Sequence, residues 1–354
     1  MNILRRNTRQ VKVGSLSIGS QSPISVQSMS SASANDIPAC VGQALKLQQV
    51  GCDIFRFAVP NKESAAVFAA AKNASVTMPL VADIHFDYRI AIECAAAGAD
   101  KIRINPGNIG DDSRVKEVVK ACRQYGIPIR IGVNSGSLEK EILAKYGSPT
   151  PDALAESALY HASLLEKFDF YDTVISIKSS NSQNVIKANR ILAQRCDYPL
   201  HVGVTEAGSE RMGVIKSAIG IGSLLADGIG DTIRVSLTAD PVNEIKAAKD
   251  ILRAAGYCDS GINIVSCPTC GRTQIDLIKL VSDFEARQNE IKIKKPLTVA
   301  LMGCVVNGPG EAKEADIGIA GGIGEALLIK KGNVIRKISE ENIISELIDE
   351  INRM

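Results

Sequence analysis

Short runs of β-branched and other apolar residues alternate with amphipathic stretches through most of the chain. Each run ends in a polar tip, and the stretches between them repeat apolar residues at helical spacing, as in PACVGQALKLQQ, RIAIECAAAG, SRVKEVVKACRQYG and VNEIKAAKDILRAAG. The runs are ISVQSMS (24–30), DIFRFAVP (53–60), PLVADIHF (79–86), KIRINPGN (101–108), PIRIGVNSGS (128–137), TVISIKSS (173–180), PLHVGVTEAG (199–208) and DTIRVSLTAD (231–240). Strand–helix alternation predicts a parallel sheet, and eight such units predict a closed (β/α)8 barrel.

An open doubly wound sheet alternates strands and helices in the same way. We favour the closed barrel because nearly every predicted strand ends in side chains suited to binding or catalysis, which an open sheet does not require. The stretch ILRRNTRQVKVGSLSIG (3–19) is predicted to form a β-hairpin ahead of the first barrel strand. Residues 1–257 are therefore predicted to form a TIM-barrel domain.

The pattern changes after residue 257. GINIVS and LTVALMG are predicted strands, separated by a predicted helix, TQIDLIKLVSDFEARQ, and a charged connector, IKIKKP. DIGIAGG, EALLIKKG and NVIRKI follow, and EENIISELIDEINR is predicted to close the chain as a helix. Residues 258–354 are therefore predicted to form a separate small α/β domain.

The composition of the chain argues against several classes of protein. The chain has 354 residues, of which 45% are hydrophobic and 23% charged, as in an ordinary globular protein. A net charge of +2 gives no support to strong nonspecific binding of nucleic acid. No apolar run approaches the ~20 residues of a membrane span, and the opening MNILRRNTRQ lacks the apolar core of a signal peptide. We therefore expect a cytoplasmic protein with neither a nucleic acid nor a membrane as partner.

Polar and charged residues gather at the ends of the predicted strands, where barrel enzymes carry their chemistry. They are Arg56, Asp83, His85, Arg103, Asn105, Arg130, Asn134, Lys178, His201, Thr205, Glu206, Arg234 and Ser236. Residues two apart, such as Arg103 and Asn105, face the same side of a strand. Four arginines and a lysine converging on one cavity would repel one another without an anionic ligand. Because guanidinium groups match phosphate oxygens, a compact diphosphate is the predicted ligand.

Each of these residues also has an ordinary structural explanation. A single arginine at a strand end is commonly solvated or salt-bridged, although five cations on five strands favour the anion site. His85 and His201 suit either a structural role or ligand contact. Asp83 and Glu206 either pair with an arginine or transfer protons, and Glu206 is the better candidate for proton transfer.

The nine cysteines fall into two groups. Cys40, Cys52, Cys94, Cys122 and Cys196 lie in or beside apolar helical segments and are predicted core residues, whereas Cys258 is ambiguous. Cys267 and Cys270 form a CPTC motif, which suits a zinc site, a redox pair or an iron–sulfur cluster. The third thiol of the second group is Cys304.

A fourth ligand is not obvious, because Cys304 is the only Cys or His after Cys270. Glu311 follows an NGPG turn that can bring its carboxylate back toward the thiols. Three thiolates and an exchangeable carboxylate would suit a catalytic [4Fe–4S] cluster. The alternatives are that Glu311 is a surface acid and Cys304 a buried core thiol.

The motifs QSMS, FRFAVP, ADIHFDYR, KIRINPGNIG, IGVNSGSL, ISIKSS, VGVTEAG, GIGDTIRVSL, CPTCGR and GCVVNGPGE together resemble one family. It is the ferredoxin- or flavodoxin-dependent 4-hydroxy-3-methylbut-2-en-1-yl diphosphate synthase family of the methylerythritol phosphate pathway. The resemblance covers essentially the whole chain, in the short bacterial two-domain form. It implies a reductive ring opening and dehydration of 2-C-methyl-D-erythritol 2,4-cyclodiphosphate.

The resemblance also implies roles for individual residues. Cys267, Cys270, Cys304 and Glu311 would hold a [4Fe–4S] cluster in the second domain. The diphosphate would be bound in the first domain by Arg56, His85, Arg103, Arg130, Lys178 and Arg234. Asn105, Asn134, Thr205 and Glu206 would complete the pocket, with Glu206 as the essential acid.

Two partners follow from the same resemblance. Family members are expected to be homodimers in which the cluster domain of one subunit covers the barrel of the other. The electron donor would be a flavodoxin or ferredoxin, for which IKIKKP with Lys330 and Lys331 is a candidate docking strip or an ordinary solvated surface.

Two other functions remain open on sequence grounds. The DIHF and NPGN loops are similar to those of pterin-phosphate-binding barrels, so a condensing or aldolase-type enzyme with a structural zinc module is one alternative. An iron–sulfur carrier that binds a phosphate compound without transforming it is the other.

Overall fold

The computed structural model describes residues 4–20, 22–257, 261–292, 295–306, 310 and 312–354. Glu311, Cys258 and part of the IKIKKP connector lie outside the described residues. The chain divides into two compact units, Met1–Tyr257 and Cys258–Met354. Each unit is described on its own.

Within the described residues of the first unit, eight parallel strands form one sheet in the order β8-β7-β6-β5-β4-β3-β10-β9. They are β3 (Ser25–Met29), β4 (Ile54–Ala58), β5 (Leu80–Asp83), β6 (Lys101–Ile104), β7 (Ile129–Asn134), β8 (Thr173–Lys178), β9 (His201–Val202) and β10 (Thr232–Ile233). A parallel bridge between Ile175 and Leu200 joins β8 to β9. The sheet therefore closes on itself, and the predicted (β/α)8 barrel is confirmed.

The last two strands are shorter than their sequence runs. Beyond Val202 the chain leaves the ladder, and the N–H of Thr205 donates to the carbonyl of Ser179 at 3.2 Å in the loop after β8. The residues expected at the tips of β9 and β10 thus lie on loops at the carboxyl end of the barrel.

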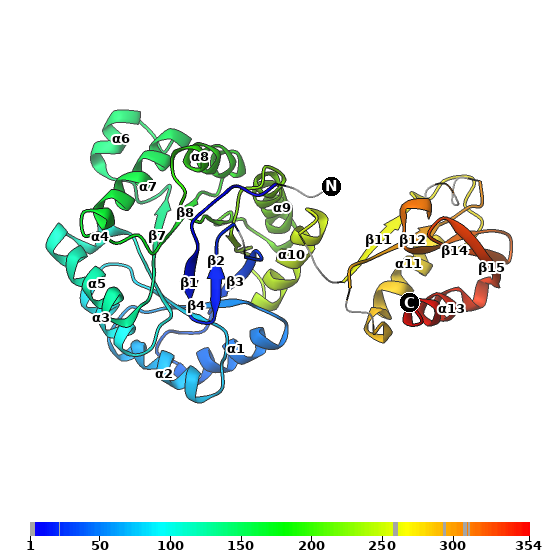
Figure 1. Cartoon of the computed structure of the whole chain (residues 1–354), viewed down its shortest axis with the longest axis horizontal. Coiled ribbons are helices and arrows are strands. Elements are labelled where there is room, and N and C mark those ends of the chain that lie inside the picture. The colour runs from blue at the N-terminus through cyan, green and yellow to red at the C-terminus, as the bar shows by residue number, and fades with distance from the viewer. Residues whose placement is uncertain (1–3, 21, 258–260, 293–294, 307–309, 311) are drawn as a thin grey trace. The chain divides into compact units, whose positions relative to one another are not determined.

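A hairpin covers one end of the barrel (Figure 1). Strands β1 (Val11–Val13) and β2 (Leu16–Ile18) pair antiparallel around Gly14, whose φ of 55° belongs to the left-handed region that favours glycine. The buried residues of the hairpin pack against Ile54, Val81 and Val174. These three residues lie at or next to the first position of β4, β5 and β8. The hairpin therefore seals the amino-terminal end of the barrel and leaves its carboxyl end free for a ligand.

Helices surround the strands (Figure 1). They are α1 (Ile37–Gln49), η1 (Glu63–Ala65), α2 (Ala66–Asn73), α3 (Tyr88–Ala96), α4 (Pro106–Ile109), α5 (Asp112–Tyr125), α6 (Lys140–Tyr146), α7 (Pro151–Glu166), α8 (Ser182–Arg195), α9 (Glu210–Ala226) and α10 (Pro241–Ala254). Acid and amide side chains cap many of their first turns, as Asp36 caps α1 and Asp111 caps α5. Gly126 ends α5 in the left-handed conformation, as its position at the end of the apolar repeat predicts.

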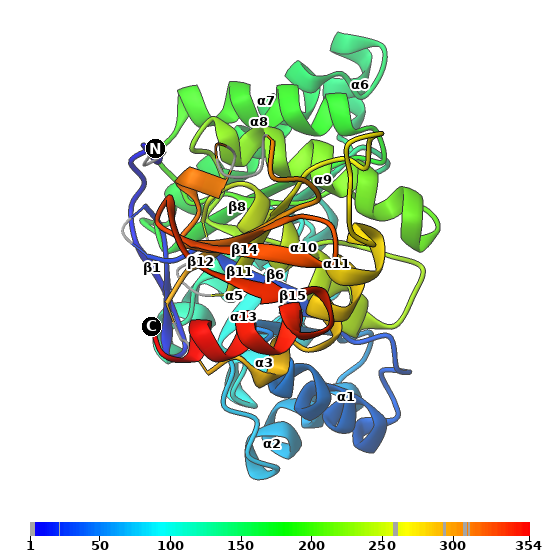
Figure 2. The same cartoon turned by 90° about the vertical axis from the view of Figure 1, so that its right-hand side faces the viewer.

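In the described part of the second unit, five strands form a mixed sheet in chain order. They are β11 (Ile262–Ser266), β12 (Leu297–Met302), β13 (Ile317–Gly321), β14 (Glu325–Lys330) and β15 (Asn333–Ser339), of which the first three are parallel. Helices α11 (Leu277–Ala286) and α13 (Ile343–Asn352) pack with the sheet through one core that includes Phe284, Leu347 and Ile351 (Figure 2). The short 3-10 turns are η2 (Gln288–Glu290), η3 (Ala312–Glu314) and η4 (Glu340–Asn342).

Among the described residues, no helix combines the length and the apolar character that crossing a membrane requires.

Candidate functional site

The carboxyl ends of neighbouring barrel strands bring the predicted cations together. Asp83 pairs in register with Arg103, and Arg103 pairs with Arg130 on the next strand. Because register partners in a parallel sheet face the same side, these three side chains point into the barrel. Gly132 makes room for them, since a Cβ there would lie 2.3 Å from Nε of Arg103.

Asp83 is the counter-charge at the centre of this group. Its carboxylate accepts a hydrogen bond from Arg103 at 2.8 Å and lies 3.5 Å from Nε of Arg56. Burial alone would raise the pKa of Asp83, but Arg56 and Arg103 outweigh it and hold that pKa well below its usual range. Asp83 is therefore an anion that orients two arginines.

Arg130 and Lys178 are buried without an ion pair among the described residues, whereas Arg56 shares the carboxylate of Asp83 with Arg103. Arg56, Arg130 and Lys178 are 7%, 1% and 6% exposed. Burial, together with neighbouring cations, lowers the pKa of Arg56 to about 10 and the pKa values of Arg130 and Lys178 well below their usual ranges. An anion bound among these cations would offset both the free-energy cost of burying their charges and the repulsion between them.

Arg234, from the loop after β10, completes the cationic mouth. It lies 3.4 Å from the buried carboxylate of Glu244 on α10, which also accepts a hydrogen bond from Ser28 at 2.8 Å. Nη1 of Arg234 and the guanidinium of Arg56 both contact the sulfur of Met29. A thioether is a weak acceptor, so these donors keep capacity for a stronger one. Glu244 could not be predicted from the sequence, because it lies on a helix behind the strands.

Of the two predicted asparagines, Asn105 directly follows β6 and Asn134 is the last residue of β7. Asn105 caps α4 by accepting from the N–H of Gly107, and its Nδ2 lies 3.5 Å from the hydroxyl of Ser137. Ser137 in turn donates its N–H to the carbonyl of Asn134 at 3.0 Å. Ser137 thus connects the loop that contains Asn105 to the end of the strand that carries Asn134.

A buried contact that sequence reasoning missed supports these loops. Nε2 of His161, on α7 and 0% exposed, contacts Oε1 of Glu139, which directly precedes α6. Gly107 lies against both, because a Cβ there would be 3.0 Å from His161 and 3.3 Å from Glu139. No role had been assigned to His161, since an isolated histidine in a helical segment carries no local signal.

The other predicted pocket residues are more exposed. Glu206 is exposed and has a φ of 50°, a left-handed conformation that is unusual for glutamate and that recurs at functional sites. Thr205 beside it is half-buried, and His85 is exposed after β5. The hydroxyl of Ser236 is buried without a hydrogen-bond partner among the described residues.

In the second unit, the carboxyl ends of two adjacent parallel strands carry cysteines. Cys267 follows β11 and Cys304 lies two residues beyond β12. Gly303 joins the two segments, because its N–H donates to the sulfur of Cys267 at 3.3 Å and its carbonyl accepts from Gln274 at 2.9 Å. The CPTC loop is therefore held against the residue that precedes Cys304.

The chemistry of these thiols suits metal ligation. Cys270 is exposed, and hydrogen bonds from the backbone and side chain of Arg272 lower its pKa, which favours the thiolate that binds metals. In the described part of the chain, no three Cys, His, Asp or Glu side chains lie close enough together to surround one metal ion. A cluster with several irons accepts ligands spaced around it, and the predicted fourth ligand, Glu311, lies outside the described residues. The cysteines are soft thiolate donors of the kind that an iron–sulfur cluster uses.

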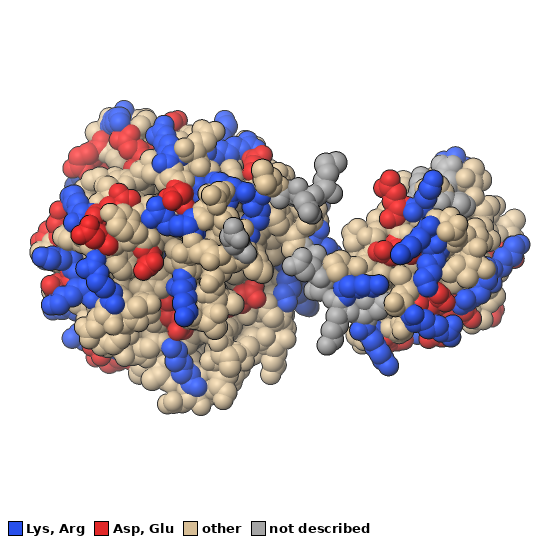
Figure 3. All heavy atoms as spheres, in the orientation of Figure 1, with Lys and Arg blue, Asp and Glu red and all other residues tan. Residues whose placement is uncertain are grey.

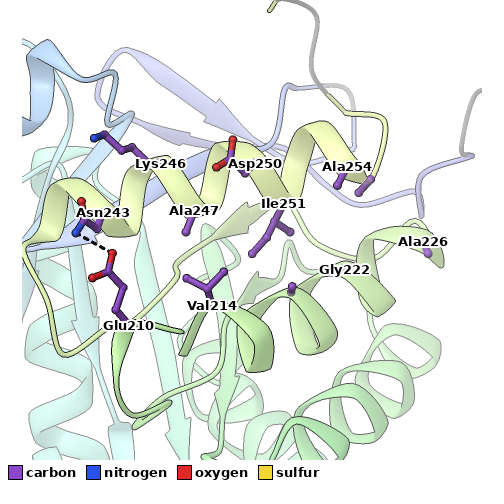
Figure 4. Close-up of a pocket in the computed structure, with 12 residues that line it drawn as sticks. Glu210, Val214, Gly222, Ala226, Asn243, Lys246, Ala247, Asp250, Ile251 and Ala254 are labelled. Carbon is purple, nitrogen blue, oxygen red and sulfur yellow. Dashed lines mark hydrogen bonds between the residues drawn. The ribbon is translucent and has the colours of Figure 1, made fainter. Parts of the chain in front are cut away.

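A groove on the outside of the barrel contains none of the predicted residues (Figure 4). It has a volume of about 600 Å³ and lies between α9 and α10, lined mainly by small apolar residues such as Val214 and Ala247. Glu210 accepts a hydrogen bond from Asn243 at 2.9 Å across it. This groove offers no cluster of buried charges comparable with the barrel mouth.

The surface charge is mixed. Figure 3 shows Lys and Arg interspersed with Asp and Glu on the face that carries the hairpin. Inside the barrel mouth, by contrast, the cations outnumber the carboxylates that pair with them.

The fold and the side chains at its carboxyl end define a class: a (β/α)8-barrel protein with buried cations at the carboxyl ends of its strands, followed by a cysteine-bearing α/β domain. Residues 8–249 match the model of the GcpE TIM-barrel domain, and residues 263–353 match that of the GcpE protein C-terminal domain. The chain belongs to the GcpE family.

Close relatives carry a common name. A protein from Clostridium perfringens is 57% identical over 97% of this chain and 98% of its own length, and is named 4-hydroxy-3-methylbut-2-en-1-yl diphosphate synthase (flavodoxin). A protein of the same name from Caldanaerobacter subterraneus subsp. tengcongensis is 56% identical over 99% of this chain and 98% of its own length. The family resemblance drawn from the sequence is confirmed.

Two solved structures of other enzymes are similar in fold to about two thirds of this chain. Dihydropteroate synthase from Xanthomonas albilineans aligns with a TM-score of 0.50 and 14% identity over 70% of this chain and 97% of its own. Type I 3-dehydroquinate dehydratase from Clostridium difficile aligns with a TM-score of 0.50 and 16% identity over the same shares. At these identities the similarity shows the fold and says nothing of the reaction.

Proposed function

We propose that this chain catalyses the reaction named by its relatives, as an oxidoreductase of isoprenoid precursor biosynthesis. It opens the ring of 2-C-methyl-D-erythritol 2,4-cyclodiphosphate and removes one hydroxyl, yielding (E)-4-hydroxy-3-methylbut-2-enyl diphosphate. Two electrons and two protons enter, one ring C–O bond breaks to free the diphosphate, and one water leaves. Identity above 50% along the whole chain with relatives of that name supports the assignment.

One observation carries the proposal at the level of the site: five cations from five strand ends meet in the barrel, three of them almost fully buried. Arg56, Arg103, Arg130, Lys178 and Arg234 bind the cyclic diphosphate in this proposal, and His85 adds a donor at the rim. Holding the phosphates fixes the carbon skeleton relative to the mouth. Asn105, Asn134, Thr205 and Ser236 supply uncharged hydrogen bonds around it.

Departure of a hydroxyl as water requires a proton. Glu206 is the candidate donor because it lies at the carboxyl end of the barrel in an unusual backbone conformation. Asp83 is a poor candidate, since Arg56 and Arg103 hold its pKa low and keep it ionised after burial is taken into account. The two acids of the mouth therefore have different roles: Glu206 moves protons, and Asp83 orients arginines.

Cys267, Cys270, Cys304 and Glu311 are the residues that would hold the [4Fe–4S] cluster. When bound, the cluster supplies the two electrons of the reaction and one iron with an exchangeable ligand. The position of Gly303 between the CPTC loop and Cys304 supports a shared site.

The partners follow from the reaction and from the relatives' names. Flavodoxin is the proposed electron donor, because the names of both relatives specify it. We keep the homodimer with a site shared between subunits, and a cytoplasmic location, as part of the proposal. The eight cysteines that the structure describes are free thiols, as expected in a reducing compartment.

The direct test is turnover. Protein purified under nitrogen, with the cyclodiphosphate and reduced flavodoxin, should release the hydroxymethylbutenyl diphosphate, and no product from cluster-loaded protein would contradict the proposal.

Lys178→Gln should weaken substrate binding by about 10-fold or more through loss of a buried cation. Lys187→Gln, an exposed lysine on the helix after the same strand, should bind as the unaltered protein does.

A further inference from the structure

A layer of polar side chains fills the barrel between the hairpin seal and the arginines. Lys101, Gln27 and His201 are 0%, 1% and 0% exposed. Barrels of this type usually fill their interior with branched apolar residues. A buried polar layer therefore calls for a functional explanation.

The register of the strands places Lys101 in this layer. It pairs with Val81 across β5 and β6, and Val81 packs in the cluster beneath the hairpin. Arg103, two residues further along β6, faces the same side and reaches the mouth. The aliphatic chain of Lys101 thus starts in the apolar floor and its amine lies below the arginines.

No acceptor serves this amine. Nζ of Lys101 is buried without a hydrogen-bond partner among the described residues, and so are Nε2 of Gln27 and Nε2 of His201. The groups that act on the amine from the neighbouring strands are Arg130 on β7 and Arg56 on β4, both cations. His201 on β9 couples to Lys101 as well, and also to Lys178 on β8.

A protonated Lys101 would be a buried, unpaired charge among like charges, which is an expensive arrangement. Burial first, and then Arg130 and Arg56, lower the pKa of Lys101 well below its usual range. Burial first, and then Arg130 and Lys178, lower the pKa of His201. Geometry and electrostatics agree that the interior of the free barrel disfavours further positive charge.

We propose that Lys101 is a neutral amine in the free enzyme and takes one proton from solvent when the substrate's cyclic diphosphate binds above it. This inference rests on the proposed function. The bound anion offsets the charges of Arg56 and Arg130, which removes the repulsion that keeps the amine neutral. Substrate binding and proton uptake are then thermodynamically linked.

The substrate makes the linkage measurable. In a cyclic diphosphate each phosphorus keeps a single, strongly acidic hydroxyl, so the ligand is fully ionised at neutral pH and carries no titrating group of its own. Any proton taken up on binding at pH 8 therefore goes to the protein.

Calorimetry of the oxidised holoenzyme tests the proposal, because binding occurs without turnover when no reductant is present. Titration with the cyclodiphosphate at pH 8 in buffers of different ionisation enthalpy gives the number of protons exchanged. We expect uptake of about one proton for the unaltered enzyme, none for Lys101→Met, and about one for Lys116→Met, an exposed lysine on α5. Uptake that persists in Lys101→Met would assign the proton to another buried group, such as Lys178 or His201, and would overturn the proposal.

A second measurement needs no variant. If one proton is bound with the substrate, the Kd of the unaltered enzyme rises about 10-fold for each pH unit between 7.5 and 9. A Kd that stays constant over this range overturns the proposal even if Lys101→Met fails to fold. Failure of the cyclodiphosphate to bind at any pH would instead contradict the proposed function.

Discussion

The carboxylate of Asp83 accepts a hydrogen bond of 2.8 Å from the guanidinium of Arg103 inside the barrel mouth. The same carboxylate lies 3.5 Å from Arg56, so one buried acid links two strands on either side of its own. Arginine side chains have many rotamers, and this contact selects those that direct the remaining N–H groups toward the ligand. We interpret Asp83 as a residue that acts on the substrate through the arginines it orients.

Replacing Asp83 by asparagine should destabilise the barrel. The change leaves Arg56 and Arg103 buried without their counter-charge, and loss of one partner of a buried pair costs about 3–5 kcal/mol. Chemical denaturation at pH 7 measures the effect. The matched control is Asp87→Asn, which removes an exposed pair with Arg89 and should change stability by less than about 1 kcal/mol.

The same pair predicts a pH dependence. The pKa of Asp83 is lower in the folded state than in the unfolded state. The contribution of its ionised carboxylate to the free energy of unfolding is therefore fully present above the unfolded carboxyl pKa of roughly 4, and it is lost as the pH falls through the folded-state pKa. The stability difference between the unaltered protein and Asp83→Asn should therefore be constant near neutrality and shrink in acid. A difference that grows on acidification would contradict the assignment of an ionised Asp83.

Gly132→Ala should displace Arg103. A Cβ at position 132 would lie 2.3 Å from Nε of Arg103, and the guanidinium must move away from the position that Asp83 fixes. Loss of a charged hydrogen bond of about 1.5–3 kcal/mol predicts a substrate Kd raised about 10- to 100-fold, measurable by calorimetry.

Gly136 provides the control for this change. It lies in the loop after the same strand, and a Cβ there meets nothing within 4 Å. Gly136→Ala should leave the Kd unchanged. Equal effects of the two substitutions would show that the loop, and not Arg103, sets the affinity.

The contact between Glu139 and His161 should be energetically coupled to substrate binding. Glu139→Gln and His161→Gln each loosen the loop that contains Asn105 and the loop that follows Asn134, so each should raise the Kd of the substrate. In a double-mutant cycle the two effects should be non-additive by about 0.5–3 kcal/mol, because both changes break one contact. Additive effects would mean that the two residues act separately.

Cys270→Ser should reduce the iron bound per chain, because Cys270 is one of the proposed thiolate ligands. Serine preserves the size of the side chain and removes the soft sulfur donor. Cys196→Ser is the control, since Cys196 lies at the end of α8 in the barrel and bonds to the carbonyl of Leu192. Equal iron in both variants and in the unaltered protein would exclude Cys270 as a ligand.

The barrel and its cationic mouth follow from the sequence because parallel strands repeat a simple rule. An apolar run that ends in polar residues places those residues at one end of the sheet, so Arg103 and Arg130 could be expected to meet before the structure was known. The starting point of α11 could not be predicted from the sequence. Its first residue is Leu277 and not Thr273, because Asp276 caps the helix and Thr273 bonds to Cys270 in the CPTC loop.

Other features depend on contacts between segments that are far apart in the chain. Lys101 begins its strand, where a lysine is ordinarily solvated, and only the closure of the barrel and the hairpin below it enclose the amine. Glu139 and His161 meet because a loop and a helix from different βα units pack together. Neither the burial of Lys101 nor the contact between Glu139 and His161 has a local sequence pattern, because both arise only in the assembled fold.

We propose that a sulfur-ligated iron cluster and a diphosphate-binding barrel act together in this protein. The most direct test is the iron and acid-labile sulfide content of protein purified under nitrogen, measured with its electronic and paramagnetic spectra. We expect about four iron and four sulfide per chain, with the spectrum of a [4Fe–4S] cluster. One tightly bound zinc per chain, with neither iron nor sulfide, would contradict it.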